Sequence, residues 1–337
     1  MHTIVRKSAA FVALAATVAA TVMRIVLTPQ MQDANNGSFH LSYAVIALMV
    51  AAFAAVLVLI LVGKGTVSHA EELSARARLP LAVSALAAGG VLATASLFDS
   101  WLWLRYGITP PPNDTVISPL DAGSLALTLI FGILGGFFLL WLGIAVAGGT
   151  LRRTTPLALA ALTPVLWIWF RLVRYELSYA SAVQVSQSFY DFVMLIFTML
   201  FLFSFARYIS GTGEKAEPQK ASRMLLVYSL CTAIMSISGP ITDIVLYMTG
   251  ETAAYNASRL AGFPDLGVGV FALCTALVLL FARPIPAEEL PEETAPAEEA
   301  ADGENREEGI GETEDPASLP AETAEDILNG LRGDYRD

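Results

Sequence analysis

Histidine and cysteine, the side chains that most often bind haem and zinc, are scarce in this chain of 337 residues. The three histidines, at positions 2, 40 and 69, lie outside the apolar runs or at their edges. The two cysteines, Cys231 and Cys274, each lie inside an apolar run, where a thiol usually serves as a small packing residue. The sequence therefore predicts no bound metal, no cofactor and no disulfide.

The sequence motifs of several enzyme classes are also absent. There is no phosphate-binding P-loop, no H-E-x-x-H zinc motif and no G-x-S-x-G nucleophile motif. No serine and histidine share one apolar run, as an intramembrane serine protease would need. Asp99, Asp191 and Asp243 do lie in apolar runs, but no helix-borne signature or glycine-rich motif marks them as an aspartyl dyad. We expect no catalytic residue, and an enzyme is the least favoured of three interpretations.

Basic residues are few in the last part of the chain. Residues 284–337 hold 18 of the 31 acidic residues and three arginines, so this segment carries a net charge of −15. The rest of the chain carries +4, with 17 basic and 13 acidic residues. The acidity of the protein thus belongs to its C-terminal tail. This balance argues against nucleic acid as a partner, because nucleic-acid binding needs basic faces.

Apolar residues are abundant and strongly clustered. They make up 55% of the chain, and the mean hydropathy is +0.59. Runs longer than the ~17 residues that a helix needs to cross a bilayer recur along the sequence. They are continuous and lack the alternation of barrel strands, so only helices can satisfy their backbone polar groups. We predict an all-α, polytopic transmembrane helix bundle over residues 1–283, with a lipid bilayer as its surroundings and about eight spans: 8–28, 41–63, 79–104, 122–147, 156–173, 187–208, 222–248 and 265–283.

Lysine and arginine alternate between the ends of these spans in a way that predicts the orientation of the chain. The basic residues that flank one side are Arg6, Lys7, Lys64, Arg76, Arg78, Arg152, Arg153, Arg207, Lys215, Lys220, Arg223 and Arg283. The opposite side has no lysine, so we predict a plasma-membrane protein with both termini cytoplasmic. Alternatively, the first span is a signal peptide cleaved near Ala19 and Ala20, although its apolar run continues past Arg24.

Two stretches of the membrane domain resemble each other. WLWLRY at 101–106 matches WIWFRL at 167–172, and Leu-Ile-Phe recurs at 129–131 and 195–197 with the same offset. Residues 78–131 and 153–197 are therefore interpreted as copies of one helical hairpin, a type of repeat found in some transporters. The alternative is that membrane segments rich in alanine and leucine resemble one another by composition.

Several features of the spans point to packing and anchoring. The glycines at 89, 90, 132, 135 and 136 should let neighbouring helices approach closely. The tryptophans at 101, 103, 167 and 169, with Arg105 and Arg174, should anchor the spans at the membrane surface. Pro240 follows Gly239 within the seventh span and should kink it, because proline lacks the backbone N–H.

Charged residues inside the spans are the candidate site. Arg24, Asp99, Arg171, Asp191 and Asp243 all fall in the outer part of their spans by the predicted orientation. Such residues are costly in a membrane and usually mark a functional site. One hypothesis is a polar layer that lines a cavity for a small polar solute, in which the arginines contact an anionic group and the aspartates balance charge or carry protons. The other is a set of ion pairs that only ties the helices together.

The acidic tail suggests a different role. Residues 284–317 are rich in Glu, Ala and Pro and are predicted to be disordered. A short helix is predicted at 323–332, with Ile327, Leu328 and Leu331 on one face, although Gly330 weakens it. Residues 318–337 could then dock on a cytosolic protein or on the basic inner loops, or the tail could only solubilise. The leading function is solute binding or transport, and the alternative is a membrane scaffold or regulator that acts through this tail.

Overall fold

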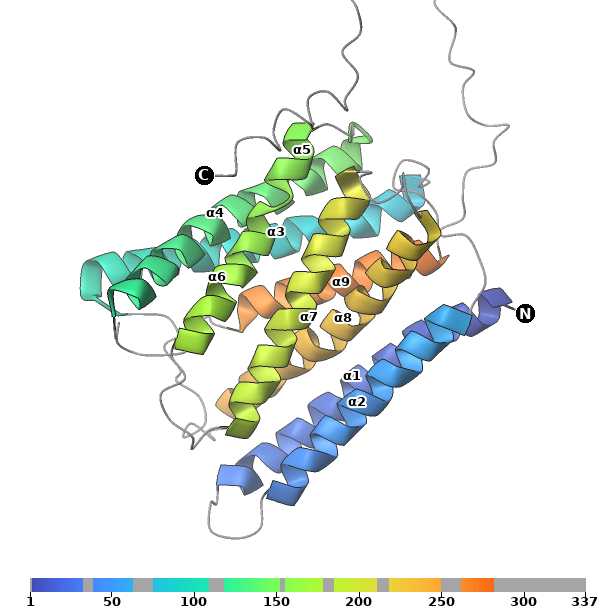
Figure 1. Cartoon of the computed structure of the whole chain (residues 1–337), viewed down its shortest axis with the longest axis horizontal. Coiled ribbons are helices and arrows are strands. Elements are labelled where there is room, and N and C mark those ends of the chain that lie inside the picture. The colour runs from blue at the N-terminus through green and yellow to red at the C-terminus, as the bar shows by residue number, and fades with distance from the viewer. Residues whose placement is uncertain are drawn as a thin grey trace, which may run out of the picture. The chain divides into compact units, whose positions relative to one another are not determined.

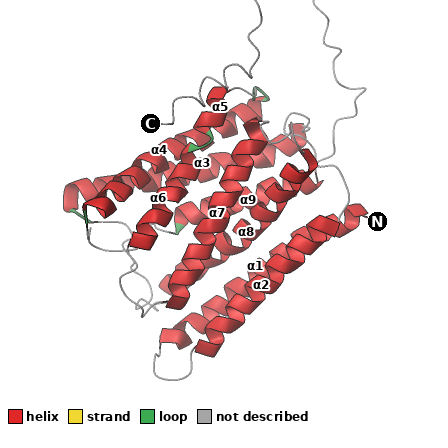
Figure 2. Cartoon of the chain, viewed as in Figure 1, coloured by secondary structure: helices red, strands yellow, loops and turns green. Residues whose placement is uncertain are grey.

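The computed structural model describes residues 2–32, 39–62, 75–108, 118–151, 155–177, 185–210, 218–249 and 262–281. The chain divides into two units, Met1–Leu290 and Pro291–Asp337, and every described residue belongs to the first. The predicted disordered tail and its helix at 323–332 therefore lie outside the described residues, as does the docking segment 318–337. The elements of the described part are all helices (Figure 2).

The helices run in the order α1 (His2–Gln32), α2 (Phe39–Val62), α3 (Ala75–Tyr106), α4 (Pro119–Gly148), α5 (Thr155–Ala160), α6 (Thr163–Leu177), α7 (Val185–Ser210), α8 (Pro218–Met248) and α9 (Phe263–Phe281) (Figure 1). Eight spans within the described residues are long and apolar enough to cross a membrane. The predicted all-α bundle with eight spans is confirmed, and the architecture is that of a multi-pass membrane protein.

The fifth span is the one that departs from the predicted pattern. The sequence predicts a single helix, but the structure divides it into α5 and α6 with a turn at residues 161 and 162. Leu162 donates its N–H to Leu159 O at 3.1 Å, and α6 restarts when Leu166 bonds to Leu162 O at 2.9 Å. Pro164 fits here because it lies in the first turn of α6, where its missing N–H removes no helical hydrogen bond.

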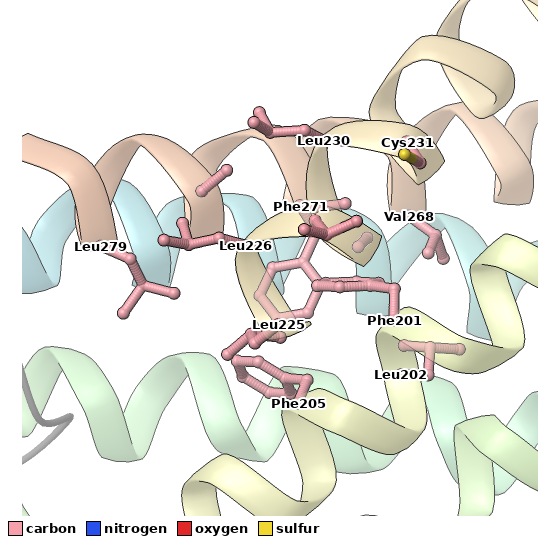
Figure 3. Close-up of a cluster of buried hydrophobic side chains, with 14 of the residues drawn as sticks. Phe201, Leu202, Phe205, Leu225, Leu226, Leu230, Cys231, Val268, Phe271 and Leu279 are labelled. Atoms are coloured by element: carbon pink, nitrogen blue, oxygen red, sulfur yellow. The ribbon is translucent and has the colours of Figure 1, made fainter. Parts of the chain in front are cut away.

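Helix α8 lies at the centre of the packing and contacts α1, α2, α7 and α9. Its apolar side meets aromatic rings from two neighbours, as Figure 3 shows. Phe271 of α9 packs edge-on against Phe201 and Phe205 of α7, with ring centroids 5.7 and 4.9 Å apart. Leu225 and Leu226 of α8 are fully buried in the same cluster. The hydrophobic core thus joins α7, α8 and α9.

Glycines bring α4 into close contact with two other helices. A Cβ atom at Gly136 would lie 2.6 Å from the backbone nitrogen of Ala93 in α3, and one at Gly89 would lie 2.7 Å from Gly136 O. On the other side, a Cβ atom at Gly135 would lie 3.0 Å from Pro164 Cα in α6. The predicted close packing is confirmed for these glycines and for Gly132. It is wrong for Gly90, whose added Cβ would meet its nearest atom only at 4.0 Å.

Helix α8 continues through Pro240 without interruption. Because proline has no N–H, the carbonyl of Ser236 loses its usual helical partner at this point. A Cβ atom at Gly262 would come within 3.2 Å of Pro240 Cβ, so the chain packs closely against the proline just before α9 begins. The break in the hydrogen-bond ladder lies one turn before Asp243, among the charged side chains described next.

Candidate functional site

Six charged side chains from six helices meet at one end of the bundle. Arg24 interacts electrostatically with Asp191 and Asp243, and Arg171 interacts with Asp99, Asp191 and a further residue, Asp265. The charged layer is defined as these six residues: Arg24 of α1, Asp99 of α3, Arg171 of α6, Asp191 of α7, Asp243 of α8 and Asp265 of α9. The structure thus brings together all five residues singled out from the sequence and adds one.

Arg171 has a carboxylate partner within the protein. Its Nη1 lies 2.6 Å from Asp265 Oδ1 and its Nη2 lies 2.9 Å from Asp265 Oδ2, which is the bidentate geometry of a strong ion pair. The arginine side chain is 24% exposed and the aspartate 5%. Asp265 lies in the first turn of α9, where the helix dipole favours a negative charge. Arg171 also stacks over Trp167, 4.9 Å from the ring centroid.

Arg24 is held in a different way. Its guanidinium carbon lies 3.7 Å from the centroid of the Tyr190 ring, a close cation–π contact. Its Nη1 atom is buried and has no hydrogen-bond acceptor among the described residues. A Cβ atom at Gly239 would lie 3.7 Å from this nitrogen and 3.4 Å from Tyr190 Cε1. The orphaned donor therefore faces a position on α8 that carries no side chain.

Hydroxyl groups between α7 and α8 fix the tyrosine beneath Arg24. Tyr190 Oη donates to Met235 O at 2.9 Å and lies 2.5 Å from Ser238 Oγ. Further along the same interface, Thr232 Oγ1 donates to Phe197 O at 2.8 Å, across the two helices. Hydrogen bonds of this kind are a common way to join helices inside a membrane. The ring that carries Arg24 is therefore a rigid platform.

The exposure of the charged layer separates it from the other buried charges. Arg24, Asp99, Arg171, Asp191 and Asp243 are all partly exposed, and only Asp265 is buried. The helices therefore do not fully enclose these five residues.

Asp121 and Arg174 form a second ion pair, which we call the sealed pair. Arg174 Nε lies 3.1 Å from Asp121 Oδ1, and each side chain is 3% exposed. The sequence assigns Arg174 and Trp167 to anchoring at the membrane surface, and this is wrong for both, because Arg174 is 2% and Trp167 3% exposed. Arg174 is neutralised by an acid from α4, and Trp167 is covered by α4 and by Arg171.

Sequence reasoning missed Asp121 and Asp265, which share a local signal. Each lies in the first turn of a helix with a proline just before it, Pro119 or Pro264. Acidic residues are common in the first turn of any helix, because the helix dipole favours a negative charge there. The pattern by itself therefore does not reveal a partner arginine on another helix. Only the packing of α6 against its neighbours shows that both acids pair with arginines of one helix.

Other known proteins give no guide to this site. No family model matches the chain, and no curated protein or solved structure is detectably similar to it. Among the described residues, no group of three or more histidine, cysteine, aspartate or glutamate side chains is placed to hold a metal ion.

Proposed function

We propose that this protein binds a small polar solute at the charged layer and carries it across the plasma membrane. The observation that supports the proposal is the convergence of charges of both signs from six helices, five of them still partly exposed. Intramembrane charges are expensive, and proteins keep them mainly where a substrate or ion must be handled. In this proposal both termini are cytoplasmic and the charged layer faces outward, because lysine and arginine dominate the opposite side.

The two arginines of the layer have different roles in this proposal. Arg171 is already bonded through both terminal nitrogens to Asp265, so its role in the proposal is to join α6 to α9 and shape the layer. Arg24 keeps a donor nitrogen without an acceptor in the described part of the chain, so it is the arginine that contacts the solute. Asp191 and Asp243 interact electrostatically with Arg24, so in the proposal they act on the same solute.

A purely structural role would favour a different arrangement. Charges that only hold helices together are most stable when each is paired and shielded from water, as Asp121 and Arg174 are. The charged layer instead leaves five of its six members partly exposed. This exposure supports a site that is completed by something from outside the chain.

The test is the accessibility of a thiol placed in the layer. In a variant without native cysteines (Cys231→Ala and Cys274→Ala), Asp243→Cys is compared with the matched control Asp121→Cys. We expect a membrane-impermeant maleimide, added to the outer side of intact cells, to label Asp243→Cys and not Asp121→Cys. Protection of Asp243→Cys from the reagent, on both sides of the membrane, would contradict the proposed function.

A second candidate function is a scaffold or regulator that acts through the cytosolic tail. The observation that favours it is the apolar face of Ile327, Leu328 and Leu331, which follows a long acidic segment. Deletion of residues 318–337 tests this candidate. Loss of specific co-purifying proteins in the deletion variant would support it, and an unchanged set of proteins would remove its basis.

A further inference from the structure

We propose that a pair of arginines, Arg207 of α7 and Arg223 of α8, binds the headgroup phosphate of anionic phospholipids. The pair lies at the end of the bundle opposite to the charged layer, which we call the basic end. Here α1, α3 and α8 begin, and α2, α4, α7 and α9 end. This binding is independent of the proposed function, since it involves neither the charged layer nor a solute.

Charge is divided unequally between the two ends of the bundle. Within the described ranges, all acidic residues lie at the end that holds the charged layer: Asp99, Asp121, Glu176, Asp191, Asp243 and Asp265. The bases whose side chains are described at the basic end are Lys7, Arg78, Arg207 and Arg223. By sequence, the segments that begin, end or connect the helices at the basic end hold 12 basic and 4 acidic residues before residue 284. Carboxylates that could neutralise these bases are therefore few in the membrane domain.

Two of the four described bases are stabilised within the fold. Lys7 Nζ lies 5.1 Å from the centroid of the Phe281 ring, at the last residue of α9. A Cβ atom at Gly149, the C-cap of α4, would lie 2.5 Å from Arg78 Nη1, so this guanidinium lies against the end of α4. A base at the C-terminus of a helix interacts favourably with the helix dipole. The positions of Lys7 and Arg78 therefore require no ligand.

The hydrogen bonds between α7 and α8 place Arg207 and Arg223 at the same level. The two helices run in opposite directions, and Thr232 of α8 donates to Phe197 O of α7. Arg207 lies ten residues after Phe197, and Arg223 lies nine residues before Thr232. With a rise of ~1.5 Å per residue, the two arginines are level to within about 2 Å. Packed helices lie about 8–10 Å apart, so the two guanidinium groups are close enough to repel each other.

The fold compensates the charge of Arg223 less well than that of Lys7 or Arg78. Arg223 is partly buried, and its Nε atom has no acceptor in the part of the chain that the structure describes. It lies in the second turn of α8, so the nearer end of the helix dipole is the positive one. Arg207, in the last turn of α7, is exposed and adds a second positive charge. A phosphate that bonds to both guanidinium groups would replace their repulsion with charge-assisted hydrogen bonds.

A phospholipid is the source of phosphate that fits the position of this pair. Arg207 lies three residues before the end of its span at Ser210, and Arg223 lies two residues after the start of its span at Ala221. Arginines at this depth extend their side chains to the headgroups of the bilayer. In the orientation predicted from the sequence, the basic end faces the cytoplasm, where the leaflet carries anionic lipids. A free phosphate ion would meet the same two groups but is not concentrated at the membrane surface.

The test is the melting temperature of the full chain in two kinds of nanodisc, one of phosphatidylcholine alone and one that also contains phosphatidylglycerol. Anionic lipid then surrounds both ends of the protein, so Arg105→Gln, at an exposed arginine of the opposite end, is the matched control. We expect phosphatidylglycerol to raise the wild-type melting temperature by about 2 °C or more. The shift should fall by more than half in the double variant Arg207→Gln with Arg223→Gln, fall less in Arg207→Gln alone, and persist in Arg105→Gln.

Each shift is a difference between two discs for one variant, so a variant that is less stable in both discs remains informative. Equal melting temperatures of the wild type in the two discs would overturn the lipid site and favour another anionic occupant, such as the acidic tail. An undiminished shift in the double variant, or an equal fall in Arg105→Gln, would also overturn it, because the effect would then come from general surface charge. A third arm adds inorganic phosphate to phosphatidylcholine discs at constant ionic strength. A shift as large as that from phosphatidylglycerol would assign the pair to the free ion and contradict the lipid.

Discussion

The sealed pair and the charged layer consist of the same residue types at the same end of the bundle. They differ in the exposure and the hydrogen bonding of their side chains. Asp121 and Arg174 are 3% exposed each and bonded to one another. In the layer, Arg24, Asp191 and Asp243 are partly exposed, and a nitrogen of the arginine lacks an acceptor among the described residues. Helix α6 contributes to both regions, since Arg171 and Arg174 lie one turn apart on it.

The difference shows what a membrane protein does when a charge is needed only for structure. The two charges are then bonded to one another and buried, so that each partner compensates for the lost hydration of the other. Five residues of the layer are less completely buried, which is costly inside a membrane unless the charges interact with a ligand or ion. Substitutions at equivalent positions in the two regions should therefore have very different effects on stability.

The largest effect is expected from breaking the sealed pair. Asp121→Asn keeps the shape of the side chain but removes the negative charge that lies 3.1 Å from the buried guanidinium of Arg174. We expect a loss of about 3–5 kcal/mol in the free energy of unfolding. The measurement is reversible unfolding in mixed micelles, or the melting temperature in nanodiscs if unfolding is not reversible.

The double variant Asp121→Leu with Arg174→Met is the control for this prediction. It removes both charges and replaces them with apolar groups of similar length, so most of the lost stability should return. A double variant as unstable as Asp121→Asn would show that the contacts of each residue matter more than their mutual charge, and the description of this region as a matched pair would be wrong.

A smaller effect is expected from adding a methyl group at two glycines, one at the contact between α3 and α4 and one beside Arg24 of the charged layer. In Gly136→Ala the new Cβ would lie 2.6 Å from the backbone of Ala93, so α3 and α4 must separate. We expect a loss of about 1–3 kcal/mol from this overpacking. In Gly239→Ala the nearest atom is 3.4 Å away, and stability should be unchanged or higher, because alanine favours a helix by ~1 kcal/mol over glycine.

Melting temperatures of the two glycine variants in nanodiscs check this pair of predictions together. Equal losses in both would mean that the space beside Arg24 is as tightly packed as the contact between α3 and α4. That result would contradict the ordinary van der Waals spacing between Gly239 and its neighbours Tyr190 and Arg24.

A still smaller effect is expected from the hydroxyl contacts beneath the charged layer. Thr232→Val removes the bond from α8 to Phe197 O while keeping the shape of the side chain. Hydrogen bonds between membrane helices contribute ~0.6 kcal/mol on average, and we expect a loss of that size. Thr94→Val is the matched control, since among the described residues the Thr94 hydroxyl bonds to carbonyls of its own helix. Equal losses in the two variants would argue against a rigid platform at α7 and α8.

The sequence predicted the spans and the membership of the charged layer for a common physical reason. Crossing a bilayer requires a long apolar run, so the spans stand out by hydropathy alone. Ionisable residues are rare in such runs, so each one, for example Arg24 or Asp243, can be identified individually from the sequence. Because spans alternate in direction, the depth of each charge follows from its place in its span, and depth was sufficient to group five of the six.

The sequence did not predict which acidic residue forms an ion pair with which arginine. The partners of Arg171 and Arg174 come from α9 and α4, and both acids lie at helix starts where acids are ordinary. The break between α5 and α6 was also missed, because a proline in the first turn of a helix and one inside a helix look alike in sequence. These features depend on tertiary packing, which hydropathy does not record.

The smallest change in stability is expected from Asp243→Asn, in contrast with the large loss expected for Asp121→Asn. Asp243 is partly exposed and shares Arg24 with Asp191, so neutralising it leaves the arginine with another carboxylate. Removing one of two aspartates that compete for one guanidinium also relieves repulsion between them. We expect the melting temperature of the variant in nanodiscs to stay within about 1–2 °C of the wild type or to rise, as substitutions at functional sites often do. A loss as large as that of Asp121→Asn would mean that Asp243 belongs to a structural pair, and the scaffold hypothesis would then be the better account of this protein.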